Sequence, residues 1–265
     1  MKVQYSCPIP ALSPFIEAYV VVDDRDGELP MSPLQTVPMP FAALSVNFCE
    51  RSWDSAGNRH PEVALLGLQT RVRHWVSGAS TLFVMVLLTP AGVMTLFPRL
   101  GEHTGNALRD LSDLWGRSQT DRFREATASI LSADGQLDRW AISMLSDRDP
   151  DAPSLVDALR CYGRPAAAAS ALDMSLRTFE RRFRRELGVT PTELINLQRL
   201  QQSLKTTRRS SSHDVVDHGF ADQSHEIRHW RRYLGTSPGR YRKGGASSAA
   251  HALESAEPGG AVFYL

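Results

Sequence analysis

The stretch Ser175–Pro191, SLRTFERRFRRELGVTP, recurs 47 residues later as Asp222–Pro238, DQSHEIRHWRRYLGTSP. Each copy begins with a residue that can cap a helix, continues with an arginine-rich body and reaches Leu-Gly near its end. Ser and Asp are favoured at helix N-caps, and Gly is favoured just beyond a helix end. The repeat therefore predicts two equivalent helices, each with its own start and stop signals.

The first copy has two distinct faces when it is drawn as a helix. At about 100° per residue, the apolar side chains gather on one arc and the arginines on the other. The apolar arc consists of Leu176, Phe179, Phe183 and Leu187, and the basic arc of Arg177, Arg181, Arg184 and Arg185. We expect the apolar arc to pack against other helices and the basic arc to face outward.

The residues before the first copy predict a partner helix. Pro165–Leu172, PAAAASAL, has proline at a suitable first position and alanines that allow close helix approach, and the LDMS sequence that ends at Ser175 has the length of a tight turn. A short helix, a tight turn and a second helix with a basic outer face form the helix-turn-helix arrangement, whose second helix enters the DNA major groove. A single arginine-rich face is more often a solvated surface, but two spaced copies favour DNA binding.

A further helix is expected between the two copies. Thr190-Pro191-Thr192-Glu193 is a capping box with proline at the first helical position, and the helix can continue to about Lys205. At ~1.5 Å per residue this helix is roughly 22 Å long. Such a spacer can place two recognition helices in successive major grooves, which lie about 34 Å apart along one face of DNA.

The charge distribution separates the chain into an acidic and a basic part. The formal net charge of the 265 residues is only +1. Residues 160–243 nevertheless hold 17 Lys and Arg against 8 Asp and Glu, whereas residues 1–159 hold 13 against 19. Only the basic part has the charge expected of a module that meets the phosphate backbone.

The remaining organisation predicts an α+β protein. Short apolar runs separated by Pro and Gly predict a β-rich region, and they are Tyr19–Val22, Ala43–Phe48, Ala64–Leu68, Thr81–Leu88 and Val93–Phe97. From about Asn106 the apolar residues recur at helical spacing. We therefore expect a β-rich regulatory region over 1–105, a helical connector and linker over 106–153, a helical DNA-binding domain over 154–243 and a disordered tail over 244–265.

These motifs resemble the AraC/XylS-type bacterial transcription regulators, whose DNA-binding domain holds two helix-turn-helix units joined by a helix. The resemblance is carried by SLRTFERRFRRELGVTP, LQRLQQSLKTT and GFADQSHEIRHWRRYLGTSPGRYR, and the match as a whole covers about 85 residues. More faintly, LLGLQTRV and TPAGV resemble the sensing domains that accompany this module. The resemblance implies an activator or repressor that binds duplex DNA, recruits or obstructs RNA polymerase, and responds to a small effector or to homodimerisation through its N-terminal domain.

The resemblance also assigns contact residues by position. In the first unit it implies base contacts from Arg177, Glu180 and Arg181, and in the second from Ser224, His225 and Arg228, with Gln223 nearby. Arg can contact guanine with two hydrogen bonds, and Glu can accept one from cytosine. The remaining arginines are expected to hold phosphates: Arg184, Arg185, Arg231 and Arg232.

The second unit departs from the family pattern. Glu226 stands where the recognition helix normally carries a buried Phe, and an unpaired buried carboxylate is costly. The preceding helix is also unusually polar, with Ser211, Ser212, His213, Asp214, Asp217 and His218 around only Val215 and Val216. We therefore hypothesise that the second unit is weakened, so that affinity depends mainly on the first unit and on dimerisation.

Two alternative functions follow from the same region. Residues 225–229 spell HExxH, the pattern of a zinc-dependent hydrolase in which two histidines bind the metal and Glu is the general base. The arginines around the motif would repel a metal ion, and such a short pattern arises readily by chance. A degenerate helix-turn-helix module that binds a protein partner is the other alternative.

The remaining features favour a cytoplasmic protein without a cofactor or metal. Three widely spaced cysteines cannot form a disulfide framework, and the longest apolar run, Thr81–Thr89, is too short to span a membrane. The start of the chain has no apolar core of a secretory signal. An effector pocket can be lined by Trp53, Trp75, Phe83, Arg73 and His74, although aromatic residues in a small β domain more often form plain core.

Overall fold

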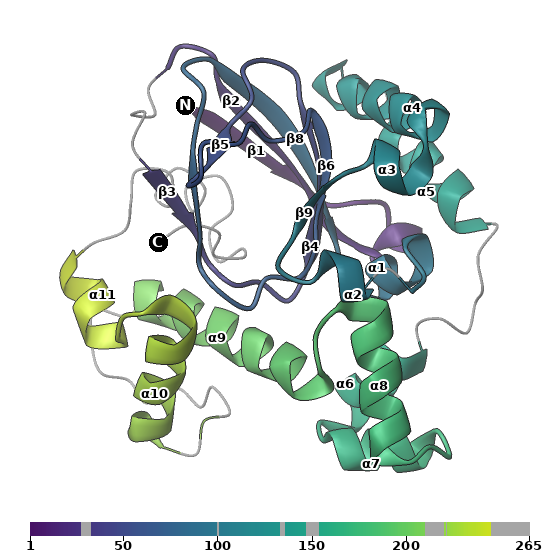
Figure 1. Cartoon of the computed structure of the whole chain (residues 1–265), viewed down its shortest axis with the longest axis vertical. Helices are drawn as coiled ribbons and strands as arrows, with labels where there is room; N and C mark the ends of the chain where they lie inside the picture. The colour runs from purple at the N-terminus through teal and green to yellow at the C-terminus, as the bar shows by residue number, and fades with distance from the viewer. Residues whose placement is uncertain are drawn as a thin grey trace.

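The computed structural model describes residues 1–27, 33–99, 101–132, 136–146, 154–209, 220 and 222–244. The N-terminal part consists of two β-sheets covered on one side by helices, and the C-terminal part is helical (Figure 1). The fold class is α+β, as the sequence predicts. Among the described residues, no helix is long and apolar enough to cross a membrane.

Two antiparallel sheets form the β region. The larger sheet has the strand order β1-β2-β8-β4-β6-β9, and the smaller has the order β3-β7-β5. The strands of the larger sheet are β1 (Lys2–Ser6), β2 (Ile16–Asp24), β4 (Ala42–Asn47), β6 (Val63–Leu66), β8 (Thr81–Leu88) and β9 (Leu108–Asp110). Those of the smaller sheet are β3 (Pro33–Thr36), β5 (Trp53–Asp54) and β7 (Arg73–Val76).

The central strands of the larger sheet are buried on both faces. Because side chains alternate along a strand, Leu44 and Val46 of β4 point toward the helical layer, whereas Ala43 and Ser45 point toward the interior between the sheets. This double burial explains why β8 is a nearly continuous apolar run, TLFVMVLL.

The helical layer packs on the outer face of the larger sheet. Its principal aromatic residues, Phe123 and Trp140, belong to one buried cluster with Leu44 and Leu65 of the sheet. The layer contains η1 (Pro10–Leu12), α1 (Pro90–Leu96), α2 (Gly101–Thr104), α3 (Ser112–Trp115), α4 (Arg117–Ala128), η2 (Ser129–Ser132) and α5 (Gln136–Ser146). The helical periodicity predicted for this stretch is therefore confirmed for α4 and α5.

Two of the expected boundaries in this part are wrong. Val93–Phe97, expected among the β-forming runs, lies in and just after helix α1 because the Thr89 hydroxyl caps the backbone N–H of Gly92 and Pro90 occupies the first helical position. Leu108, expected in the helical connector, begins strand β9, which pairs with β6 at the edge of the larger sheet. The linker residues 147–153 and the tail residues 245–265 lie outside the described residues.

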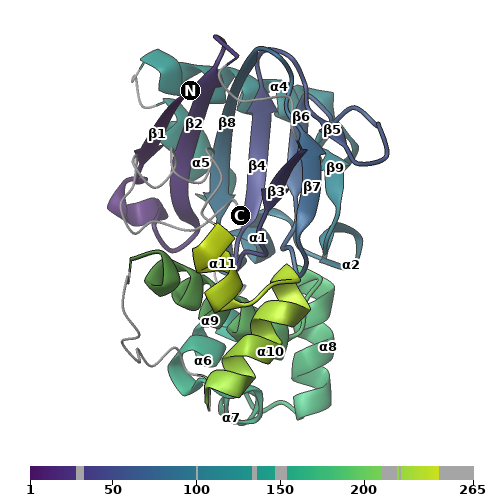
Figure 2. The same cartoon turned by 90° about the vertical axis from the view of Figure 1, so that its left-hand side faces the viewer.

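The C-terminal helices lie below the β region in both views (Figures 1 and 2). They are α6 (Ser154–Tyr162), α7 (Pro165–Ala171), α8 (Leu176–Leu187), α9 (Pro191–Arg209), α10 (Gln223–Leu234) and α11 (Pro238–Gly244). Leu197 and Leu200 of α9 belong to the same buried cluster as Val20 and Met39 of the β region. The Gln201 side-chain amide also donates to the Pro38 carbonyl at 3.1 Å, so α9 is packed directly against the β region.

Candidate nucleic-acid interface

Helix α8 begins and ends where the repeat predicts. The Ser175 hydroxyl accepts a hydrogen bond from the Thr178 backbone N–H at 3.1 Å, and Gly188 ends the helix with a φ of 74°. The three aromatic and leucine side chains at the predicted core positions, Phe179, Phe183 and Leu187, are fully buried. Leu176, expected on the same arc, is instead 42% exposed because it lies in the first turn, beyond the packed core.

The helix before α8 completes the first helix-turn-helix unit. Helix α7 presents the small, buried residues Ala168 and Ala169 to its neighbours, which permits close packing. The turn that follows is closed by a hydrogen bond from the Met174 N–H to the Ala169 carbonyl at 2.9 Å, and Asp173 adopts a φ of 52°. The short helix, tight turn and basic second helix are therefore all present.

The capping box at the start of α9 is also confirmed. The Thr190 N–H donates to Glu193 Oε2 at 2.7 Å, and the Glu193 N–H donates to Thr190 Oγ1 at 3.1 Å. The helix runs to Arg209, four residues beyond the predicted end at Lys205. Its 19 residues give a length of about 28 Å, so it crosses from α8 toward α10 (Figure 1).

Helix α10 has the same length, the same type of N-cap and the same type of C-terminal end as α8. It has the same length of 12 residues, its Asp222 carboxylate accepts a hydrogen bond from the His225 N–H at 2.7 Å, and Gly235 ends it with a φ of 68°. Both helices point their N-terminal ends away from the β region (Figure 1). The expected helix before α10, around His213, Val215, Val216 and His218, lies outside the described residues.

Glu226 is not the unpaired carboxylate that the sequence suggests. Its Oε1 accepts a hydrogen bond from the Ser203 hydroxyl of α9, and that hydroxyl in turn accepts one from Trp230 Nε1 at 2.7 Å. Ser203 and Trp230 are both fully buried, whereas Glu226 is half-buried. The polar residue is therefore tolerated because α9 supplies a matching hydroxyl. The expectation of an uncompensated buried charge is wrong.

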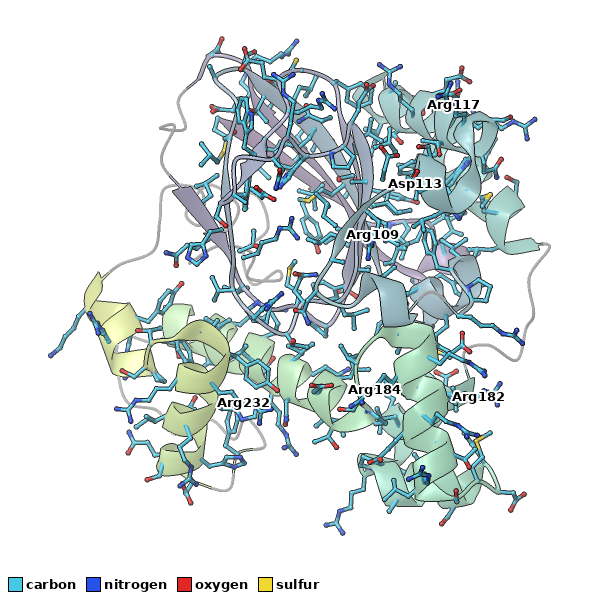
Figure 3. All side chains as sticks on the ribbon, viewed as in Figure 1. Arg109, Asp113, Arg117, Arg182, Arg184 and Arg232 are labelled. Atoms are coloured by element: carbon cyan, nitrogen blue, oxygen red, sulfur yellow. The ribbon has the colours of Figure 1, made fainter. Side chains whose placement is uncertain are left out.

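Most of the predicted contact residues lie on accessible surface. The exposed ones are Arg177, Glu180, Arg181, Arg184, Arg185, Gln223, Ser224, Arg228, Arg231 and Arg232, and His225 is half-buried. Arg185 is already engaged within the chain, because its guanidinium pairs with the Glu186 carboxylate at 3.0 Å. Figure 3 shows Arg182 and Arg184 on opposite sides of α8, and Arg232 on the side of α10 that faces α8.

Comparisons with known proteins agree with this geometry. Residues 168–244 match the family described as "Helix-turn-helix domain". The HTH-type transcriptional activator RhaS from Escherichia fergusonii is 35% identical over 81 residues. The C-terminal part of the chain is an AraC/XylS-type helix-turn-helix domain. The match to RhaS covers 29% of this chain and 29% of RhaS, so the rest of the two proteins is not aligned.

Two solved structures of ToxT from Vibrio cholerae are weakly similar to most of the chain. One, from strain O395, is 14% identical with a TM-score of 0.41 and covers 80% of this chain and 93% of ToxT. The other, determined at 1.65 Å, is 12% identical with a TM-score of 0.42 and covers 92% of this chain and 98% of ToxT.

The HExxH residues are used in packing the second unit of the AraC/XylS-type domain. The Glu226 carboxylate accepts from Ser203, and the His229 ring packs 4.9 Å from the Tyr233 ring and 5.2 Å from the Phe220 ring. Burial, with smaller contributions from His225 and nearby arginines, lowers the pKa of His229 to about 4. Among the residues that the structure describes, no group of three or more His, Cys, Asp or Glu is placed to hold a metal.

A contact between α8 and the β region was not foreseen from the sequence. The Arg99 N–H donates to Glu186 Oε2 at 2.7 Å, which ties the end of α8 to the segment before α2. A Cβ on Gly101 would lie 2.3 Å from the Gly188 nitrogen, so the two backbones touch only because both residues are glycine. Nothing in the motif itself distinguishes a glycine that ends a helix from one that also packs against a second domain.

The β region contains a cavity that is lined by only some of the residues expected from the sequence. Arg73, Trp75 and Phe83 line it, together with Met39 and Met85. Trp53 and His74, which were expected there, do not line it. His74 is exposed because it alternates with Arg73 and Trp75 along β7 and so points to the other face of the strand.

Proposed function

We propose that this protein is a sequence-specific, DNA-binding transcription regulator. The observation that carries the proposal is the matched pair of 12-residue helices α8 and α10, joined through α9, each with exposed arginines and with its N-terminal end directed away from the β region. The N-terminal residues of a recognition helix are the ones that reach base edges in the major groove. Both units therefore have exposed side chains that can contact DNA and a helix whose N-terminal end is accessible to it.

The contact residues divide into two groups in this proposal. Arg177, Glu180 and Arg181 of α8 read base edges, and Gln223, Ser224, His225 and Arg228 of α10 do the same in the adjacent groove. Arg184, Arg231 and Arg232 hold phosphates, which fixes the register without reading sequence. Arg185 can do so only while its guanidinium also pairs with Glu186.

Action at the promoter would be positional and would need no catalysis. The bound protein recruits or obstructs RNA polymerase, and the β region controls it by binding a small effector in its cavity or by forming a homodimer. The structure supports control by an effector, because Met39 connects the cavity with the DNA-binding domain. It lines the cavity and also belongs to the buried cluster that includes Leu197 of α9.

The proposal is tested by selecting bound duplexes from a random DNA pool with the purified protein at low salt. Two enriched blocks about one helical turn apart are expected if both units read bases. Affinity for the selected site should fall steeply with added salt, because each phosphate contact releases counterions. Recovery of no enriched sequence would overturn the proposal. If the protein then bound a protein partner and no DNA, the alternative of a degenerate helix-turn-helix module would be favoured.

Matched arginine variants then show how much each helix-turn-helix unit contributes to the affinity for DNA. Arg181→Ala should weaken binding by about 1–3 kcal/mol and relax specificity at one position. Arg228→Ala tests the second unit, and Arg122→Ala on α4 removes the same charge from an exposed site outside the domain. Equal losses from Arg181→Ala and Arg228→Ala would show that the second unit is not weakened. A loss from Arg122→Ala of the same size would show that only net charge matters. Zinc content of the purified protein tests the hydrolase alternative.

A further inference from the structure

The cavity in the β region is small and mainly apolar. It has a volume of about 120 Å³ and receives side chains from both sheets. Its apolar wall is formed by Met39, Leu66, Trp75, Phe83 and Met85. A cavity of about 150 Å³ holds a benzene molecule, so this one suits an apolar group of roughly five or six carbon atoms.

One side of the cavity carries a cation that has no counter-charge bonded to it. Arg73 points inward because it alternates with the exposed His74 on β7, and it is half-buried. Among the described residues, its guanidinium makes no hydrogen bond or ion pair, and burial lowers its pKa from the usual value. The Asp54 carboxylate, which interacts with it electrostatically, is occupied by hydrogen bonds from the N–H groups of Ala56 and Asn58. An unpaired, partly desolvated guanidinium is unfavourable and is stabilised by an anion.

His60 provides a second polar group at the same place. Its side chain lines the cavity, and its buried Nε2 has no hydrogen-bond partner within the described parts of the chain. Burial and the Arg73 charge lower its pKa to about 4, so the ring is neutral at pH 7. A neutral imidazole can donate one hydrogen bond to an oxygen atom without adding charge. The buried Ser52, whose backbone carbonyl accepts from the His60 backbone N–H at 2.8 Å, lies at the same wall.

We propose that this cavity binds a small monocarboxylate of about five to seven carbon atoms, with its carboxylate on Arg73 and His60 and its hydrocarbon part among Met39, Trp75, Phe83 and Met85. One cation with apolar walls selects a ligand with one negative charge and an apolar body. A sugar would leave most of its hydroxyl groups unpaired against these walls, and a phosphate group would bring more charge than one guanidinium balances. The inference rests on the proposed function, in which this ligand is the effector.

Isothermal titration calorimetry of the full chain with hexanoate, hexanamide and acetate tests the ligand class. Hexanoate should bind at least about ten-fold more tightly than hexanamide, which has the same shape without the charge. Acetate keeps the charge without the apolar body and should also bind at least about ten-fold more weakly. Equal affinity for hexanoate and hexanamide, or no binding of hexanoate at millimolar concentration, would overturn the proposal.

Arginine variants test the site. Arg73→Gln should lower the affinity for hexanoate about ten-fold or more, whereas Arg71→Gln removes a neighbouring exposed arginine and should leave it unchanged. Arg73→Lys keeps the charge and should keep the preference for hexanoate over hexanamide, which remains measurable if Arg73→Gln does not fold. An equal loss in Arg71→Gln and Arg73→Gln would place the anion outside the cavity. Because calorimetry needs no DNA, failure of this site and failure of DNA binding are distinguished.

Discussion

Gly188 and Gly235 occupy the same position in two copies of one motif, and their surroundings are opposite. Both end a 12-residue helix in the left-handed conformation, with φ values of 74° and 68°. A Cβ on Gly188 would lie 2.2 Å from the Gly101 carbonyl oxygen, whereas a Cβ on Gly235 would meet no atom of the described residues within 4 Å. The end of α8 is therefore packed against the β region, whereas the described residues leave open space beside the end of α10.

The interiors of the two units differ as well. In α8 the two core positions Phe179 and Phe183 are apolar and fully buried, whereas the corresponding part of α10 relies on the hydrogen-bonded set Ser203, Glu226 and Trp230. A repeated helical pattern thus specifies the position of each helix but leaves its partners free to differ.

Gly188→Ala should be the most disruptive change. The substitution combines left-handed strain of about 1–2 kcal/mol with a clash against the Gly101 backbone that adds about 1–3 kcal/mol. Gly235→Ala is the matched control and should lower the free energy of unfolding only by the left-handed backbone strain. The measurement is the free energy of unfolding from urea titration of each variant. Equal costs would show that the contact between α8 and α2 contributes nothing to stability.

Ser203→Ala should destabilise the second unit by roughly 1–3 kcal/mol. The change removes the hydroxyl that satisfies both Trp230 Nε1 and the Glu226 carboxylate, and buried polar groups without partners are costly. The double variant Ser203→Ala/Glu226→Leu should recover part of the loss, because it also removes the carboxylate. Chemical denaturation monitored by tryptophan fluorescence provides the measurement. If Ser203→Ala unfolds at the same urea concentration as the unchanged protein, the polar set is not a structural element.

Stability should decline in mild acid because of His229. Its pKa in the folded chain is about 4, below the ordinary 6.5, mainly because the ring is buried. The unfolded chain therefore binds more protons between about pH 6.5 and pH 4, and the free energy of unfolding falls as the pH falls through this range, by about 1–2 kcal/mol from this residue. Urea unfolding at pH 7 and pH 5 measures the change.

His60 contributes in the same direction, so a variant is needed to separate the two residues. His229→Phe keeps an aromatic ring beside Phe220 and Tyr233 and should make the dependence on pH shallower. An unchanged pH dependence in this variant would remove His229 from the explanation.

Glu186→Gln should have the smallest effect, about 0.5–1.5 kcal/mol. The amide can still accept from the Arg99 N–H, but the charge-assisted bond with Arg185 is lost, and that pair is partly exposed. The released Arg185 becomes available for phosphate, so DNA affinity measured by fluorescence anisotropy should stay the same or rise slightly. A fall in affinity would mean that Glu186 positions α8 for binding.

The elements with complete local signals were predictable from the sequence. Ser175, Asp222, Gly188 and Gly235 each satisfy a rule that involves only a few neighbouring residues, and the capping box of Thr190 and Glu193 does the same. The exposure of the arginines on α8 and α10 followed from helical periodicity. These features depend on local backbone geometry, which a single sequence specifies well.

The parts that were missed depend on contacts between distant residues. Ser203 precedes Glu226 by 23 positions, and no local pattern connects the two side chains. The docking of Gly188 on Gly101 is likewise invisible in either segment alone. The helical state of Val93–Leu96 does have a local signal, because Thr89-Pro90 is a helix start. His74 lies outside the cavity because side chains alternate along β7, so that only Arg73 and Trp75 of this strand point inward.

Helix α8 contacts the β region at its C-terminal end, so a small rotation there displaces its N-terminal end much further. The fixed point is at Gly188, and Arg177, proposed above to read a base, lies at the opposite end of a helix about 18 Å long. A rotation of about 10° at the glycine contact would displace the far end by about 3 Å, which is the length of one hydrogen bond. In the proposed complex, a rotation of this size is enough, geometrically, to move the N-terminal end of this helix into or out of register with a base pair.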